Sequence, residues 1–370
     1  MPKTFGFEKP DFRPYYFAQE KHLLSPQQIH DLRNYIKNSW TTLSRSNQDI
    51  LTSAADPKFK RSSGQSLLIY ISPQENQDQI SQKFQKILSP QDFNKLEIRL
   101  LPEKTTQIQE HGLLYLPYPY VVPGGRFNEM YGWDSYFIQV GLLRDGKLEL
   151  AKNMVDNFSY QIKHYDTLLN ANRTYYLTRS QPPFFTQMVL GVFKQTEDKK
   201  WLASQLDSIT KYYHYWTSAP KLNQETGLSR YYDLGKGIAP EVISSERDEK
   251  GKTHYDRIKE YYHTQEVTAY DVSQYYHQPS QQLTPLFYQG DRSMRESGFD
   301  PSNRFGPFNA DIIHYTPVCL NVLLYQMEQD TAEIYQILGD NQQSQKWRKL
   351  AQKRRQLINR FLWDEEAGLL

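Results

Sequence analysis

The chain has 370 residues, and 44 Lys and Arg against 42 Asp and Glu leave a formal net charge of only +2. A protein that binds nucleic acid or an anionic membrane normally shows a basic excess or a basic stripe, so we expect neither partner. Apolar residues make up 38% of the chain, but aromatic residues reach 14%, and their large side chains supply enough buried area for a large folded domain.

The N-terminal residues 1–6 (MPKTFG) lack the apolar core of a secretory signal, and no run approaches the ~18 apolar residues of a membrane-spanning helix. The single cysteine, Cys319, excludes an internal disulfide and a zinc site built from several cysteines. We therefore expect a soluble cytoplasmic protein, either a monomer or a weak homo-oligomer.

The first hundred residues combine helix and strand signals. Residues 25–26 (SP) are typical of a helix start, and apolar residues follow at helical spacing as far as Ile36. A second helical pattern covers residues 80–88, and residues 96–100 (LEIRL) alternate as in a short strand. We expect this part to form an extension of helices and short strands over residues 1–100.

From residue 134 onward the pattern is mainly helical. Apolar stripes at helical spacing occupy residues 150–162, 202–216, 318–338 and 347–361. The intervening segments are rich in aromatic residues, Pro and polar residues, and they are too long for a simple helical bundle. We expect residues 101–370 to form an α-helical domain whose long loops contain the binding groups.

The most specific segment is residues 123–136 (PGGRFNEMYGWDSY). Its Pro-Gly-Gly turn allows the backbone to approach a ligand closely. Arg126 offers a rigid set of donors, Trp133 a flat apolar face, and Asp134 an acceptor. A sugar needs this combination, because its C–H faces stack on aromatic rings while its hydroxyls require donors and acceptors. On residue types alone, a well-packed turn with a structural Arg–carboxylate pair explains the segment equally well.

The order of these residues resembles the first signature of the trehalase family of glycoside hydrolases. Residues 170–183 (NANRTYYLTRSQPP) resemble a second segment of that family, and residues 296–300 (ESGFD) resemble its Glu-Ser-Gly-Trp-Asp segment. The resemblance extends from about Leu100 to the end of the chain and covers the first hundred residues only loosely.

The resemblance implies an all-α fold, an (α/α)6 toroid of helices with a pocket at one end. We expect the toroid to be incomplete at its C-terminal side in this chain. It implies inversion at the anomeric carbon during hydrolysis of α,α-trehalose, with no cofactor and no metal. Asp300 is then the general acid. The expected sugar-binding residues are Arg126, Trp133, Asp134, Asn170, Arg179, Ser180, Gln181, Glu241 and Gly298.

A general acid must stay protonated near neutral pH, so Asp300 needs burial or a nearby negative charge to raise its pKa. Phe299 and Phe305 are candidates for an apolar wall, and Glu296 or Asp311 for the charge. Taken alone, Asp300 is more typical of a turn or helix cap; the three matching segments together favour the acid.

Two features depart from the family pattern. Inversion requires a second carboxylate about 6.5–9.5 Å from the acid, and the family's base lies near a later Gln-Trp-Asp signature that this chain does not contain. A fragment, a missing second polypeptide and an inactive protein all remain open, and we favour a truncated chain.

The second departure is Ala239, which stands where the family typically has the arginine of Arg-Pro-Glu. Loss of charge-assisted donors to a sugar hydroxyl changes which substrate a polar site accepts. Trehalose is therefore the first expectation. The alternatives are another compatible-solute glucoside, such as glucosylglycerol or glucosylglycerate, and a catalytically inactive sugar-binding protein.

Overall fold

The computed structural model describes residues 24–59, 64–242, 246–299 and 302–369. The chain divides into two compact units, residues 1–42 and 43–370, and each is described by itself. The first unit contains helix α1 (Pro26–Leu43), which begins at the predicted proline. The expected domain boundary near residue 100 stays a prediction.

The second unit begins with a small mixed region. It contains a sheet of three parallel strands in the order β3-β2-β4 and a short antiparallel pair, β1 and β5. Its elements are β1 (Ser44–Arg45), α2 (Ile50–Ala54), β2 (Leu67–Ile71), α3 (Gln77–Ile87), α4 (Pro90–Phe93), β3 (Leu96–Leu100), β4 (Leu113–Leu114) and β5 (Tyr120–Val121). The predicted helix at 80–88 and the predicted strand at 96–100 are confirmed.

Strand β2 is apolar at every position because both of its faces are buried. Ile69 and Ile71 pack with α2 and α3 on one side, and Leu68 and Tyr70 pack on the other side against Leu169. A strand covered on both faces reads as a continuous apolar run rather than an alternating one.

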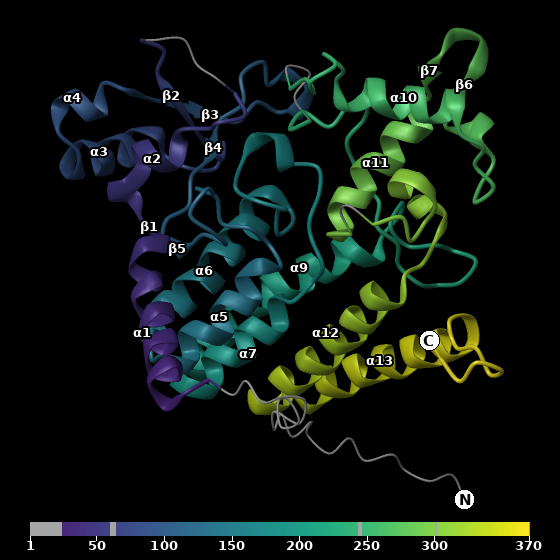
Figure 1. Cartoon of the computed structure of the whole chain (residues 1–370). Helices are drawn as coiled ribbons and strands as arrows, with labels where there is room; N and C mark the ends of the chain where they lie inside the picture. Colours follow the sequence, from purple (N-terminus) through teal and green to yellow (C-terminus); the bar gives the residue numbers. More distant parts are fainter. Residues whose placement is uncertain (1–23, 60–63, 243–245, 300–301, 370) are drawn as a thin grey trace, which may run out of the picture. The chain divides into compact units, whose positions relative to one another are not determined.

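The main body is a set of helices that pack on one another. Helix α6 contacts α5, α7 and α9, while α12 contacts α7, α9 and α13 (Figure 1). These helices are α5 (Asp134–Arg144), α6 (Leu148–Tyr165), α7 (Phe185–Thr196), α8 (Lys199–Ser204), α9 (Leu206–Thr217), α12 (Val318–Ile337) and α13 (Asn341–Phe361).

The predicted helices at 150–162, 318–338 and 347–361 are confirmed, whereas the stripe at 202–216 is divided between α8 and α9. Gln205 separates them. Its side chain is buried and accepts a hydrogen bond from Ser159 Oγ on α6, at 2.5 Å. The apolar stripe therefore continues across a break that apolar periodicity alone does not reveal.

Between α9 and α12 lies a region with a core of its own. Its tyrosines and phenylalanines pack around α10 (His254–Thr264) and α11 (Pro285–Ser297), near the antiparallel pair β6 (Tyr276–His277) and β7 (Gln282–Leu283). The short 3-10 helices are η1 (Asn47–Asp49), η2 (Thr105–Gln107), η3 (Thr174–Tyr176), η4 (Val272–Gln274), η5 (Gln278–Ser280) and η6 (Pro307–His314).

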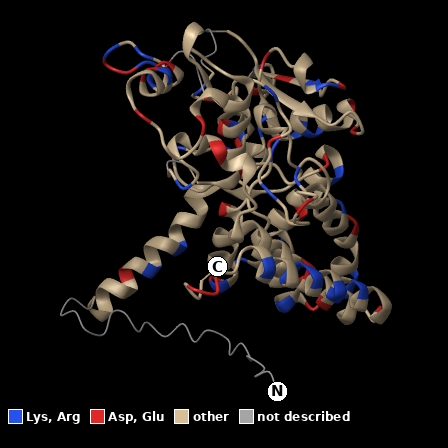
Figure 2. Cartoon of the chain, turned by 90° about the vertical axis from the view of Figure 1, so that its right-hand side faces the viewer, with Lys and Arg blue, Asp and Glu red and all other residues tan. Residues whose placement is uncertain are grey.

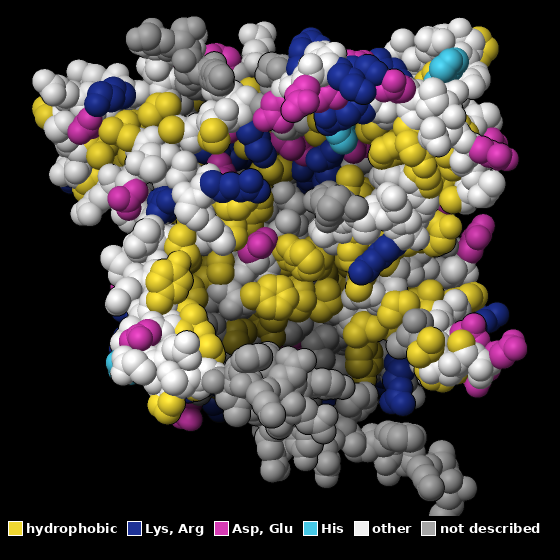
Figure 3. Space-filling view, in the orientation of Figure 1, with side chains coloured by type: hydrophobic (Ala, Val, Ile, Leu, Met, Phe, Trp, Pro, Cys, Tyr) yellow, Lys and Arg dark blue, Asp and Glu magenta, His cyan; other side chains and the backbone are white. Residues whose placement is uncertain are grey.

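Lys, Arg, Asp and Glu are interspersed along the described elements (Figure 2), and apolar side chains gather in the middle of the face shown in Figure 3. Within the described ranges, no helix has both the length and the apolar character needed to cross a membrane.

Candidate functional site

Backbone hydrogen bonds bring the first two sequence motifs together. Gly132 N donates to Asn170 O at 3.0 Å, and Asn170 N donates to Arg179 O at 3.1 Å. Trp133 N, at the start of α5, donates to the side-chain Oε1 of Gln181 at 3.0 Å. Four of the predicted sugar-binding residues, Trp133, Asn170, Arg179 and Gln181, therefore lie in adjoining segments.

Gly298 brings the third motif against the first. It ends α11 in the left-handed conformation, with φ of +72°, and a Cβ there would lie only 2.8 Å from the Trp133 ring. A residue with a side chain is disfavoured at that φ and has no room at that position. Trp133 and Gly298, both expected sugar-binding residues, are thus in direct packing contact.

A cluster of buried charged side chains lies beside these segments. Arg179 forms an ion pair with Glu241, and its Nη1 lies 3.6 Å from Asp233 Oδ2. Gly235 packs tightly against a neighbouring guanidinium, because a Cβ at that position would lie 2.1 Å from Nη2 of Arg292. The cluster thus depends on a close approach of the backbone to α11.

Helix α11 contributes two more guanidinium groups. Arg292 lies 3.3 Å from Asp233 and donates to the carbonyl oxygen of Ile238 at 3.1 Å. Arg295 pairs with Asp291 at 3.0 Å and lies 4.0 Å from Glu241. These cations surround the segment in which Ala239 replaces the arginine typical of the resembled family, and Ala239 itself is fully buried.

The formal charges of this cluster cancel. It contains the guanidinium groups of Arg179, Arg292 and Arg295 and the carboxylates of Asp233, Glu241 and Asp291. Burial raises the pKa of Glu241, but Arg179 and Arg295 outweigh burial, so that the pKa lies below its ordinary value. Burial likewise lowers the pKa of Arg179, and Glu241 and Asp233 reverse that shift. Glu241 and Arg179 are therefore ionised at neutral pH.

Several polar atoms of the cluster are buried without a hydrogen-bond partner among the described residues. They are Arg179 Nε and Nη1, Asp233 Oδ2, Glu241 Oε2 and Arg292 Nε. Buried polar groups in proteins are almost always hydrogen-bonded, and each unpaired one costs roughly 1–3 kcal/mol. Arg179 Nη1 and Arg292 Nε still face Asp233 Oδ2 in ion pairs, at 3.6 and 3.3 Å. The other two atoms, Arg179 Nε and Glu241 Oε2, are of the kind that water or a polar ligand completes.

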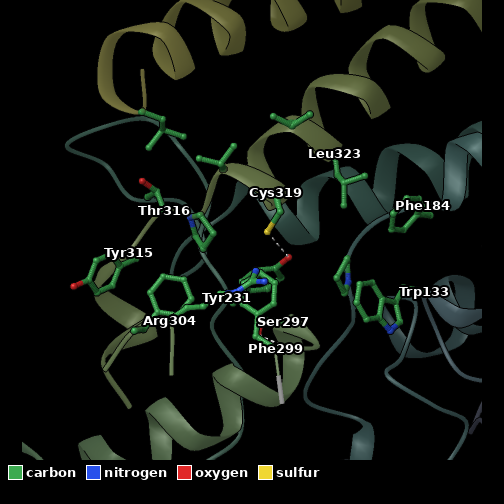
Figure 4. Close-up of a pocket in the computed structure, with 16 residues that line it drawn as sticks. Trp133, Phe184, Tyr231, Ser297, Phe299, Arg304, Tyr315, Thr316, Cys319 and Leu323 are labelled. Atoms are coloured by element: carbon green, nitrogen blue, oxygen red, sulfur yellow. Dashed lines mark hydrogen bonds between the residues drawn. The ribbon is translucent and has the colours of Figure 1, made fainter. Parts of the chain in front are cut away.

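An apolar pocket of about 750 Å³ is lined by residues that include Trp133 and Ser297. In Figure 4, Trp133 and Phe184 line one side of this pocket, and Arg304 and Tyr315 lie on the other. Phe299 and Phe305, the expected apolar wall, both line it. A separate polar pocket of about 330 Å³ is lined by Glu241, Arg295 and residues of the charged segment that follows.

The remaining predicted residues have different positions. Ser180 is fully buried, and its hydroxyl pairs with the Tyr212 hydroxyl at 2.9 Å rather than facing a cavity. Asp134 is partly buried, and burial raises its pKa. Arg126 is exposed, with its guanidinium over the Phe127 ring at 4.7 Å. Asp300 lies outside the described residues.

Some residues of the motifs are structural. Arg173 is completely buried, and its Nε donates to Glu129 at 2.7 Å. Its other nitrogens donate to the carbonyl oxygens of Ser53, Ala54 and Ala55. This pair ties the first two motifs to α2, so Arg173 and Glu129 have a structural role.

Asp233, Arg292 and Arg295 were not among the predicted residues. The sequence does contain a signal for one of them, Arg292. Helix α11 buries the charged residues Asp291, Arg292 and Glu296 at positions where an amphipathic helix normally buries apolar ones. Charged residues on the inward face of a helix indicate partners elsewhere in the fold.

The sequence model of one family, Trehalase, matches residues 10–370. The chain belongs to the trehalase family. It is 40% identical over 277 residues to the cytosolic neutral trehalase of Kluyveromyces lactis, a match covering 69% of this chain and 35% of that protein. It is 32% identical over 402 residues to the cytosolic neutral trehalase of Emericella nidulans, covering 95% of this chain and 52% of that protein.

The structure is similar to that of neutral trehalase Nth1 from Saccharomyces cerevisiae. The TM-score is 0.76 at 31% identity, and the match covers 91% of this chain and 67% of that chain. This similarity and the helical body confirm the predicted all-α toroid class. The chain thus spans between about a third and a half of the length of these two curated relatives.

Proposed function

We propose that this chain is the part of an inverting glycoside hydrolase that holds α,α-trehalose for cleavage into two glucose molecules. The observation that supports this most directly is the buried cluster of Arg179, Asp233, Glu241 and Arg292, which contains donors and acceptors without a hydrogen-bond partner among the described residues. The relatives that are named neutral trehalases favour the same substrate.

The charge balance of the cluster favours a neutral ligand. An anionic ligand needs an excess of cations, whereas each guanidinium here already faces a carboxylate. Alternating donors and acceptors in fixed positions match adjacent sugar hydroxyls, each of which both donates and accepts. Trp133 supplies the flat apolar face on which a sugar ring stacks.

The same cluster favours a sugar, rather than glycerol, as the aglycone of the substrate. Ala239 removes the guanidinium expected from the family pattern, but Arg292 and Arg295 bring guanidinium groups to this segment from α11. A glucose unit in the second subsite therefore still meets charged donors, which favours trehalose over a glucoside with a small glycerol aglycone.

In the proposed mechanism, Asp300 donates its proton to the glycosidic oxygen as the bond to the anomeric carbon breaks. A water molecule attacks that carbon from the opposite face and gives a proton to a carboxylate base, so one glucose is released as the β-anomer. Asp300 follows Phe299, which lines the apolar pocket, and an apolar surround raises the pKa of a carboxyl. The resemblance assigns no residue of this chain to the base.

We also infer a cytosolic location, because the curated relatives are named cytosolic neutral trehalases. The expectations of a small-molecule sugar as the partner, of no nucleic-acid partner, and of a monomer or weak homo-oligomer stay predictions.

A proton NMR time course tests the proposal. The protein at its natural full length is incubated with α,α-trehalose and, in parallel, with glucosylglycerol, and the anomeric signals are followed. Early β-glucose from trehalose is the expected result. Product from glucosylglycerol alone would change the substrate, and sugar binding without product from either would instead support a binding protein.

Asp300→Asn tests the role of the acid. It is expected to lower the rate of trehalose hydrolysis by about 10²–10⁴-fold, the usual contribution of general acid catalysis, while trehalose affinity is retained. Asp166→Asn, at an aspartate whose side chain is 85% exposed, is the control. A rate loss below tenfold for Asp300→Asn would remove it from this role.

A further inference from the structure

A second buried ion pair lies beside the charged cluster and differs from it in chemistry. Lys221 Nζ donates to both carboxylate oxygens of Glu296, at 2.7 and 2.6 Å, and both side chains are almost completely buried. The Lys221 ammonium also lies 4.4 Å from the centre of the Tyr215 ring. Burial lowers the pKa of Lys221, and Glu296 opposes that shift.

The carboxylate of Glu296 is a meeting point for several segments. Besides Lys221, its Oε1 accepts from Ser180 N at 3.0 Å and from the Tyr215 hydroxyl at 2.7 Å. Its Oε2 accepts from Tyr232 N at 2.8 Å. One side chain at the end of α11 is thus bonded to α9 and to the backbone of two loops.

Both backbone amides bonded to Glu296 are adjacent to residues of the proposed sugar site. Ser180 lies between Arg179 and Gln181, and Tyr232 precedes Asp233. Lys221 reinforces the second loop, because its Nζ also donates to the carbonyl oxygen of Tyr232 at 2.7 Å. The position of this one carboxylate therefore sets the positions of Arg179, Gln181 and Asp233 relative to α11.

The pair has no bonding capacity to offer a ligand. Neither Glu296 oxygen nor Lys221 Nζ is among the unpaired polar atoms of the described residues, in contrast with Arg179 and Asp233. A buried ion pair adds little to stability compared with an apolar replacement of similar volume. Its value here lies in geometry, because the hydrogen bonds of a carboxylate fix where the two loop amides lie.

We propose that Lys221 and Glu296, with Tyr215, are positioning residues of the sugar site: they hold the Arg179–Gln181 loop and the Tyr232–Asp233 loop in the arrangement that binds sugar. This inference rests on the proposed function. A misplacement of about 1 Å in such a site lowers rates by about 10²-fold. Loss of one hydrogen bond to Glu296 is therefore expected to lower the affinity for sugar strongly.

Helix α9 provides a matched pair of variants. The Tyr215 hydroxyl donates to Glu296 Oε1 at 2.7 Å, and the Tyr213 hydroxyl donates to Glu328 Oε1, also at 2.7 Å. Glu328 is likewise buried and paired with a cation, Arg354 at 2.8 Å, but it joins α12 to α13. Tyr215→Phe and Tyr213→Phe each remove one hydroxyl bonded to a buried carboxylate.

The experiment measures the dissociation constants of trehalose and glucose by isothermal titration calorimetry, and thermal unfolding, for the unchanged chain and both variants. Both variants are expected to lose similar stability. Tyr215→Phe is expected to weaken sugar binding by about 10- to 100-fold, and Tyr213→Phe by less than about twofold. In the active full-length protein, Tyr215→Phe should also raise KM more than it lowers kcat.

Equal sugar affinity in Tyr215→Phe and the unchanged chain would overturn the positioning role, and so would equal losses of affinity in the two variants. If the unchanged chain binds neither sugar, the proposed function fails instead. Should Tyr215→Phe not fold, Lys221→Arg is compared with Arg354→Lys under the same criteria. Each of these two keeps the charge and changes only the geometry of a buried pair.

Discussion

The two buried charged clusters at the end of α11 use similar residues in opposite ways. Around Glu296, each carboxylate oxygen is bonded to Lys221 and to a backbone amide of a loop. Around Arg179, the contacts of Asp233 with Arg179 and Arg292 are longer, at 3.6 and 3.3 Å, and several nitrogens and oxygens have no hydrogen-bond partner among the described residues. The Glu296 cluster is complete within the protein, and we propose that the Arg179 cluster is completed by the ligand.

This difference shows why burial and charge alone do not identify a binding site. Both clusters are deeply buried, and both pair cations with carboxylates. What distinguishes them is hydrogen-bond satisfaction, since a protein rarely leaves buried polar atoms unpaired unless water or a ligand pairs with them. The comparison assigns positioning to one cluster and ligand binding to the other.

The largest expected effect comes from removing the central cation of the open cluster. Arg179→Met leaves Asp233 and Glu241 as buried carboxylates with less compensation, and the free energy of unfolding is expected to fall by about 3–5 kcal/mol. Urea unfolding measures this loss. Trehalose at saturation should raise the melting temperature of the unchanged chain but not that of Arg179→Met. Equal stabilisation of both by trehalose would contradict the assignment of this cluster to the ligand.

Asp330 extends the comparison to a buried carboxylate with no ion pair among the described residues. Its partners are the Thr186 hydroxyl at 2.8 Å and Gln326 Nε2 at 2.6 Å. Burial raises the pKa of Asp330 to about 6, from an ordinary value of 3.8. Between these values the folded state binds more protons than the unfolded state, so stability falls as pH rises through this window.

Asp330→Asn is therefore expected to stabilise the fold by up to about 3 kcal/mol at pH 8, with the gain disappearing near pH 4. Urea unfolding of both proteins between pH 4 and 8 measures the difference. A constant difference across this range would mean that Asp330 does not titrate there.

Gly298→Ala tests the contact between the third motif and Trp133. The expected loss is about 1–3 kcal/mol, because the left-handed backbone and the short approach to the ring both oppose a Cβ. Gly339→Ala is the control, since Gly339 has φ of +88° with nothing within 4 Å of an added Cβ. Both variants lose stability from the left-handed backbone, and only Gly298→Ala also meets the Trp133 ring, so thermal unfolding of the two variants separates these two costs. Equal losses of stability would show that the Trp133 ring moves to accommodate the added Cβ.

The smallest effect on stability is expected at Arg126, which is exposed. Arg126→Ala should change the free energy of unfolding by less than about 0.5 kcal/mol, yet weaken trehalose binding if the family resemblance assigns it correctly. Calorimetric titration with trehalose decides this. An unchanged dissociation constant would remove Arg126 from the site.

Much of the helical body was predictable because its apolar stripes are local. The stripe at 318–338, for example, ends at Gly339, and α12 ends at Ile337. The break at Gln205 was not predictable, because it depends on a hydrogen bond to Ser159 in another helix. Strand β2 was not predicted, because its apolar run does not alternate. Only the folded chain shows that both faces of the strand are buried.

The candidate site shows a similar division. Resemblance supplied Trp133, Arg179 and Glu241, and the structure brings their segments together. It did not supply Asp233 or Arg292. Their side chains meet across 59 positions of the sequence, and only the folded chain shows that the two charges are buried together.

The single thiol of the chain offers a practical use of the apolar pocket. Cys319 lines that pocket together with Trp133, its Sγ lies 3.6 Å from the Tyr231 hydroxyl, and burial raises its pKa. A thiol that is mostly protonated reacts slowly with alkylating reagents, and any change in pocket access changes that rate. The protein therefore contains a built-in chemical reporter, which can record pocket occupancy in real time without an engineered label.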